Sequence, residues 1–168
     1  MKKLILLAAI IGTGLLSSCG PSQKDAITYN DGIMDLIDAL KTEHTLFIGQ
    51  IDGHNVDSLK ISHTLFADKA KKSLEESKKY GPFAEKKDFS NATHDYFMAM
   101  NSIAVNEGRQ MVEIMSKDSA HVTQDDLDKI TALANTFDET YSKAYDKLQA
   151  EQIKFSKEWK FELIETSK

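Results

Sequence analysis

The sequence predicts an all-α fold: an up-down-up-down antiparallel four-helix bundle with a long C-terminal helix. Only two prolines and eight glycines occur in 168 residues, so long stretches of good helix formers run without interruption. In four of these stretches the apolar residues recur at steps of three and four, the period of a helix with one buried face. The breaks between the stretches are short, and short connections make successive helices antiparallel.

The first two helices are bounded by residues that favour turns. The first is expected over 24–51 and ends at the turn Asp52-Gly53-His54-Asn55. The second is expected over 57–80. Gly81 would supply a left-handed cap at its end, and Pro82 would prevent it from continuing.

The third and fourth helices complete the predicted bundle. The third is expected from 88 or 90 to 116, with an inward-facing stripe of Phe89, Ala92, Tyr96, Ala99, Met100, Ile103, Glu107, Gln110, Met111 and Ile114. The fourth begins at Thr123-Gln124-Asp125-Asp126, which has the spacing of a capping box. Its apolar residues continue far along the chain, so the segment 151–168 either extends beyond the bundle or folds back on its end.

The first 18 residues have the layout of a secretory signal peptide. Met1-Lys2-Lys3 is a basic start, and the apolar run from Leu4 to Leu16 is shorter than the roughly 20 residues that span a bilayer. Leu16-Ser17-Ser18-Cys19 resembles the lipobox of bacterial lipoproteins. This resemblance implies cleavage before Cys19 and a lipid on its thiol. Residues 19–23 are then the lipidated cysteine and a short tether, and 24–168 form the bundle domain.

The lipobox resemblance also implies a location. It implies a chain that is exported and held in the cell envelope by its lipid, with acyl chains stable enough to anchor it. Gly20 rather than an aspartate follows Cys19, which implies the outer membrane. The periplasmic and the extracellular face remain equal alternatives at this point. Cys19 is the only cysteine, so the exported domain has no intramolecular disulfide.

The charge of the exported domain restricts its partners. The whole chain has a net charge of −5, which becomes −7 without the two lysines of the leader. An acidic domain without a basic cluster is poorly suited to nucleic acid or to anionic lipid. The membrane is therefore expected to be contacted through the lipid on Cys19, and other partners are expected to be proteins or surface polymers.

Three residues form a candidate metal site. His44 and His63 stand about equally far from the predicted turn centred near Gly53-His54, and both fall on an apolar stripe. Glu107 lies at a similar depth in the third helix. Two imidazoles and one carboxylate are ligands that zinc, iron or copper accept. The alternative is a polar layer of structural hydrogen bonds, and paired Glu-x-x-His motifs of ferritin-like bundles are absent from the sequence.

No pattern for catalysis stands out, and an enzyme is not expected. The exported domain has no cysteine beyond Cys19, no Gly-x-Ser-x-Gly and no glycine-rich phosphate loop. No catalytic residue and no cofactor are therefore assigned. The expected function is a non-enzymatic bundle that binds or supports another envelope or surface component. Two alternatives are a metal or small-ligand bundle using the level of His44, His63 and Glu107, and an apolar ligand pocket between helices.

Two segments resemble uncharacterised helical surface lipoproteins of unknown function. Tyr29-Asn30-Asp31 stands near the start of the first helix, and Phe155-Ser156-Lys157-Glu158-Trp159-Lys160-Phe161-Glu162-Leu163 stands near the end of the chain. The resemblance implies a helical domain on a lipid anchor. It transfers no functional residue, because that group has no assigned function.

Overall fold

The fold is all-α. A computed structural model describes residues 20–51, 53 and 55–163. Within them the order of helices is α1 (Gln23–Ile51), α2 (Val56–Ser77), α3 (Asp88–Ile103), a π-helical turn (Ala104–Gly108), α4 (Arg109–Met115), a short 3₁₀ turn (Ser119–His121) and α5 (Gln124–Trp159). None of these helices is both long enough and apolar enough to cross a membrane.

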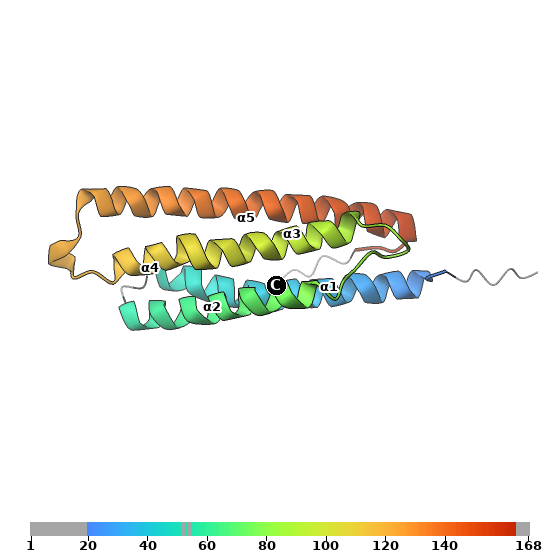
Figure 1. Ribbon diagram of the computed structural model, residues 1–168, viewed down its shortest axis with the longest axis horizontal. Helices are drawn as coiled ribbons and strands as arrows, with labels where there is room; N and C mark the ends of the chain where they lie inside the picture. Colours follow the sequence, from blue (N-terminus) through green and yellow to red (C-terminus); the bar gives the residue numbers. More distant parts are fainter. Residues whose placement is uncertain (1–19, 52, 54, 164–168) are drawn as a thin grey trace, which may run out of the picture.

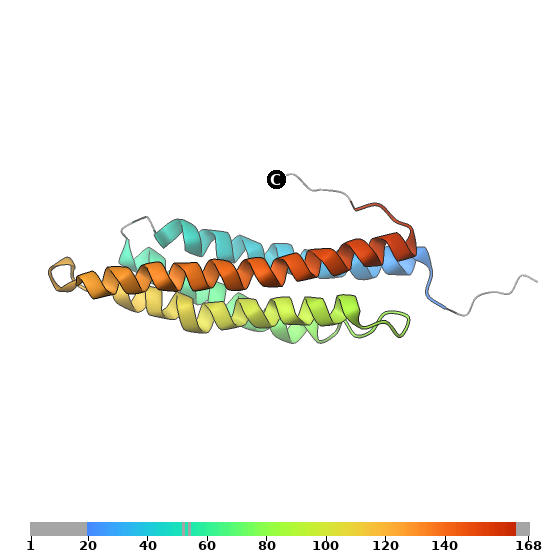
Figure 2. The same cartoon turned by 90° about the horizontal axis from the view of Figure 1, so that it is seen from above.

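The helices form a long bundle in which successive members run in opposite directions (Figure 1). The segment 88–115 is one continuous rod made of α3, the π turn and α4, and it serves as the third member. α2 packs beside α1, and the rod packs between α2 and α5. α1 and α5 also touch, but along less of their length (Figure 2).

The core runs along the bundle axis. Its largest fully buried side chains are Phe47, Phe66, Tyr96 and Phe97, which come from α1, α2 and α3. Burial of each such side chain contributes about 1.5–3 kcal/mol to folding. A second, smaller group of Met111, Ile114 and Leu133 is separate from this core and joins α4 to α5.

The two ends of the bundle differ in what they contain. One end, called here the proximal end, holds the start of α1 and the last turn of α5 (Figures 1 and 2). The other end, called the tip, holds the end of α1, the start of α2 and the connection 116–123. The described chain starts at Gly20, at the proximal end, and α1 begins at Gln23.

The predicted capping box of the last helix is confirmed. The Thr123 hydroxyl accepts a hydrogen bond from the backbone N–H of Asp126 at 3.2 Å, and the Asp126 carboxylate accepts one from the N–H of Thr123 at 3.1 Å. These bonds satisfy donors that a helix start leaves without partners. α5 therefore has a defined origin at the tip.

The predicted end of the second helix needs correction. α2 stops at Ser77, Lys78 is right-handed, and no glycine among the described residues has a positive φ. The turn is made further on by Ala84 and Glu85, with φ of 49° and 68°, between the paired residues Phe83 and Lys86. Tertiary contact explains the difference, because the carbonyl of Gly81 accepts a hydrogen bond from the Tyr29 hydroxyl.

The stripe of the third helix departs from its predicted positions around the π turn. Up to Ile103 the buried residues follow the predicted spacing, but beyond it Gly108 is buried where Glu107 was expected. Glu107 and Gln110 are only half-buried. The π turn supplies the reason, since a helical turn of this kind holds one residue more than an α-turn. Beyond it, Met111 and Ile114 are buried as predicted.

The last helix ends with the bundle and the chain then folds back. Lys160 adopts a left-handed conformation with φ 57°, and the N–H of Phe161 bonds to the carbonyl of Ser156. The Phe161 ring then packs on Phe155, with centroids 6.0 Å apart. The folding-back alternative therefore holds over residues 160–163, and residues 164–168 lie outside the described part.

Candidate functional site

His44 lies inside an aromatic cage. Its ring is stacked on Phe137 at 5.3 Å between centroids and contacts Phe66 at 5.4 Å and Tyr141 at 5.3 Å. Its Nε2 atom is buried without a hydrogen-bond partner in the structure. Loss of solvation lowers the pKa of His44, and nearby Lys41 lowers it further, although Asp138 acts in the opposite direction. The neutral imidazole is the form that this cage favours.

His63, unlike His44, has a hydrogen-bond partner for its Nε2 atom. Its Nε2 lies 2.9 Å from the backbone carbonyl oxygen of Ala104, the first residue of the π turn. Because a carbonyl only accepts, Nε2 carries the hydrogen and donates it. The ring also packs against Phe47 and against the backbone of Gly108, where a Cβ would lie 3.2 Å from the His63 Cδ2. The imidazole thus joins α2 to the π turn.

The predicted metal ligands are not assembled into a site. The Nε2 atom of His44 is buried, and its ring is stacked on Phe137. The Nε2 atom of His63 is hydrogen-bonded to the Ala104 carbonyl. The π turn moves Glu107 off the inward stripe. Among residues 20–51, 53 and 55–163, no group of three histidine, cysteine, aspartate or glutamate side chains is placed to hold a metal ion. The structural alternative, a polar layer within the bundle, describes His63 better.

One serine–histidine pair was missed in the sequence. The Ser77 hydroxyl and the His94 Nδ1 lie 3.2 Å apart where α2 and α3 face each other. The same hydroxyl donates to the Leu74 carbonyl at 2.8 Å, so it accepts from His94 rather than being deprotonated by it. Ser77 is also almost fully buried. The contact therefore serves packing. Ser77 lies 8 residues before Glu85 and His94 lies 9 residues after it, and this near-symmetry about the connection between α2 and α3 was a signal that the two residues meet.

The methionines and aromatic residues fall into two places. Met100 and Met111 are buried, Met98 is half exposed, and Met115 borders a cavity at the tip. The aromatic residues near the chain end form a cluster at the proximal end, in which Phe155 contacts the rings of Tyr29, Phe83, Phe89, Trp159 and Phe161. The aromatic cluster at the proximal end supplies packing. The cavity at the tip is a feature that the helical period does not reveal.

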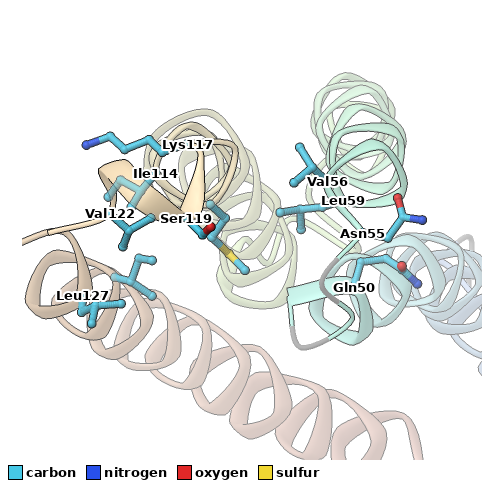
Figure 3. Close-up of a pocket in the computed structure, with 11 residues that line it drawn as sticks. Gln50, Asn55, Val56, Leu59, Ile114, Lys117, Ser119, Val122 and Leu127 are labelled. Carbon is cyan, nitrogen blue, oxygen red and sulfur yellow. The ribbon is translucent and has the colours of Figure 1, made fainter. Parts of the chain in front are cut away.

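The cavity, called here the tip pocket, has a volume of about 430 Å³. It is open to solvent and lies between the two helical hairpins (Figure 3). Val56 and Leu59 of α2 line one side, with Gln50 and Asn55 at its edge. The opposite side is formed by α4, the connection and the first turns of α5, through Ile114, Met115, Lys117, Ser119, Val122, Leu127 and Ile130. Seven of these eleven residues are apolar.

Lys117, the charged residue of the pocket lining, is neutralised by an ion pair. The Lys117 ammonium lies 2.6 Å from the Asp126 carboxylate and points away from the pocket in Figure 3. The hydrogen bond from Lys117 is the main cause that lowers the pKa of Asp126 to about 2, with further bonds from Thr123. The capping box, the ion pair and the pocket wall therefore depend on one carboxylate.

No family model, curated protein or solved structure matches this chain. The predicted lipidation site, Cys19, lies outside the described residues. The tip pocket is accordingly the candidate site that rests on the geometry of the described chain.

Proposed function

We propose that this chain is a lipid-anchored envelope protein whose helical domain binds another envelope or surface component without catalysing a reaction. The lipid would be carried by Cys19, after removal of residues 1–18 as a signal peptide. The binding surface would be the tip. The observation that carries this proposal is the placement of the tip pocket at the end of the bundle opposite to the start of α1.

The dimensions support display of the tip away from a membrane. Three residues, 20–22, separate Cys19 from the first residue of α1, which is a reach of about 10 Å at full extension. α5 has 36 residues and so spans about 54 Å. A bundle held by Cys19 would therefore start close to the lipid surface, and its tip pocket would be some tens of ångströms away from that surface.

The geometry around the histidines supports binding rather than catalysis. The imidazole of His44 is enclosed by Phe66, Phe137 and Tyr141. The imidazole of His63 donates to a backbone carbonyl, and that of His94 meets a buried serine. None of the three faces the tip pocket, whose described lining is mainly hydrocarbon. Pockets that are largely apolar with a few polar groups are typical of ligand sites.

The anchor is tested by changing Cys19 to Ala. The parent chain should incorporate radiolabelled palmitate and sediment with membranes, whereas C19A should remain unlabelled. Protease treatment of intact cells, with a periplasmic protein as the leakage control, then decides which face the domain occupies. A parent chain that stays unlabelled and soluble would refute the anchor.

The binding role is tested by photo-crosslinking in cells. A photoreactive residue at Leu127, which lines the pocket, should give a discrete adduct with one envelope component. The same residue at Leu65, which is equally exposed at 50% but lies on α2 away from the pocket, should not. Identical adduct patterns from both positions would refute a binding site at the tip.

A further inference from the structure

We infer that the tip pocket receives the hydrocarbon part of a small amphiphile whose head group is uncharged or cationic. This inference rests on the proposed function, because it names the ligand class of the same site. It is carried by three properties of the pocket: its volume, its apolar walls, and the excess of carboxylates in the segments that form it.

The size of the pocket suits a small molecule. Its volume of about 430 Å³ lies within the roughly 300–1,000 Å³ of typical ligand pockets. Both walls present branched aliphatic side chains, with Val56 and Leu59 facing Ile114 and Val122 across the opening (Figure 3). Removal of a hydrocarbon group from water between such walls is favourable by about 25 cal/mol for each Å² of apolar surface.

The pocket lies beside a small apolar group at the tip, against which Ile51 of α1 also packs. Met111 and Ile114 of α4 pack with Leu133 of α5 in a group separate from the main core. The connection 116–123 then bends around this end of the bundle (Figure 1). The start of α5 is held by its capping box and by the Lys117–Asp126 ion pair. The walls are therefore fixed by their own contacts, which reduces the ordering cost of binding.

The charge around the pocket disfavours anions. All lining residues except Gln50 belong to the segments 55–60 and 113–130, which contain six acidic residues and three lysines. One of those lysines, Lys117, is already bound to Asp126. Glu113, one of the six acids, is paired with Arg109 just outside these segments, which leaves a surplus of two negative charges. This surplus raises the energy of a carboxylate, sulfate or phosphate at the opening and lowers that of an ammonium.

Neutral polar groups are available at the edge. The amides of Gln50 and Asn55 lie side by side there, and Ser119 lies on the opposite wall (Figure 3). The Asn55 oxygen already accepts from the N–H of Ser58 at 2.9 Å, which leaves its NH₂ group to donate. An uncharged head with hydroxyl or carbonyl oxygens can use these donors without losing a strong hydration shell.

The experiment uses the chain from Gly20 onward, which contains every residue of the described core. N-phenyl-naphthylamine, a neutral fluorophore that brightens in apolar surroundings, is titrated as the probe. Three competitors with the same decyl chain then displace it below their micelle concentrations: decyl maltoside, decyltrimethylammonium and decyl sulfate. The neutral and cationic competitors should displace the probe about tenfold more strongly than the anionic one, a difference of about 1.4 kcal/mol.

The pocket is identified with a matched pair of variants. Leu127→Asp places a carboxylate on the pocket wall at a 50%-exposed position, and an acid near a helix N-terminus is compatible with folding. It should weaken probe binding about tenfold or more. Leu65→Asp makes the same change at the same exposure on α2 and should leave binding unchanged. Circular dichroism verifies that both variants keep their helices.

Each outcome has one meaning. Absence of probe binding to the parent, or equal loss in both variants, overturns the ligand site. Equal or stronger displacement by decyl sulfate overturns the assigned charge of the head group. If amphiphile binding fails but Leu127 still crosslinks an envelope component in cells, the proposed function stands and the ligand class falls. If amphiphiles bind but no adduct and no lipid label are found in cells, the proposed function falls instead.

Discussion

The Nε2 atom of His63 donates a hydrogen bond to the backbone carbonyl of Ala104 over 2.9 Å, and this bond joins α2 to the π turn within the rod 88–115. Gly108, at the other end of that turn, lies under the same imidazole. A π turn inserts one residue into a helix and persists where surrounding structure holds it. His63 and Gly108 are therefore expected to act as one unit.

The coupling between these two residues is measurable. In Gly108→Ala the new Cβ would lie 3.2 Å from His63 Cδ2, so the ring must move and its bond to Ala104 weakens. In a His63→Ala background the same change meets no ring and gains the helix propensity of alanine, about 1 kcal/mol. Urea unfolding of the four chains should give a coupling free energy of about 1 kcal/mol or more. Additive effects would show that the two residues are independent.

Acid should destabilise the domain through His44. Because burial lowers the pKa of His44 in the folded state, the unfolded chain binds the proton first as pH falls. Stability is then lost as pH drops below about 6.5, the pKa of an exposed histidine, and is regained above it. His44→Phe keeps a ring in the cage without a titratable group, so its free energy of unfolding should change less between pH 7 and pH 5.

Thermal unfolding at several pH values measures this difference. The control is His121→Phe, since His121 is exposed in the connection at the tip and its replacement should leave the acid dependence of the parent. A His44→Phe chain with the full acid dependence of the parent would contradict the role of His44.

The turn between α2 and α3 should become more stable with other residues. Ala84 and Glu85 both have positive φ, of 49° and 68°, the combination that favours Asn-Gly in a tight turn. Replacing them with Asn and Gly should raise the free energy of unfolding by about 1–2 kcal/mol, because backbone strain of this kind costs about 1 kcal/mol or more per residue. Urea unfolding at neutral pH measures this change. An unchanged free energy of unfolding would contradict strain at these two residues.

The start of α5 should depend on Thr123. Removal of its hydroxyl in Thr123→Ala breaks one half of the capping box and should cost about 1 kcal/mol. Thr131→Ala is the matched control, since the Thr131 hydroxyl bonds only to the Leu127 carbonyl within the helix and alanine has the higher helix propensity. In calorimetry, Thr123→Ala should therefore lower the midpoint of thermal unfolding, whereas Thr131→Ala should not.

Where prediction from sequence failed, a tertiary contact opposed a local rule. Glycine at 81 is the natural cap, yet the hydrogen bond from the Tyr29 hydroxyl holds its carbonyl in another arrangement. Glu107 fits a strict helical period, yet the π turn at Ala104–Gly108 replaces it with Gly108 on the buried stripe. The sequence also predicts His44 and His63 at one level of the bundle. Their rings are nevertheless directed to separate partners.

Residues close together in the chain suffice to predict the all-α class, the four long helical segments and the capping box at Thr123, because helical period and capping depend on residues within a turn or two of each other. The leader and Cys19 are likewise a local pattern, and their role stays a prediction. The π turn, the cage around His44 and the tip pocket follow from no such local pattern. Each of these depends on side chains far apart in the chain, and a pocket is the space that they fail to fill.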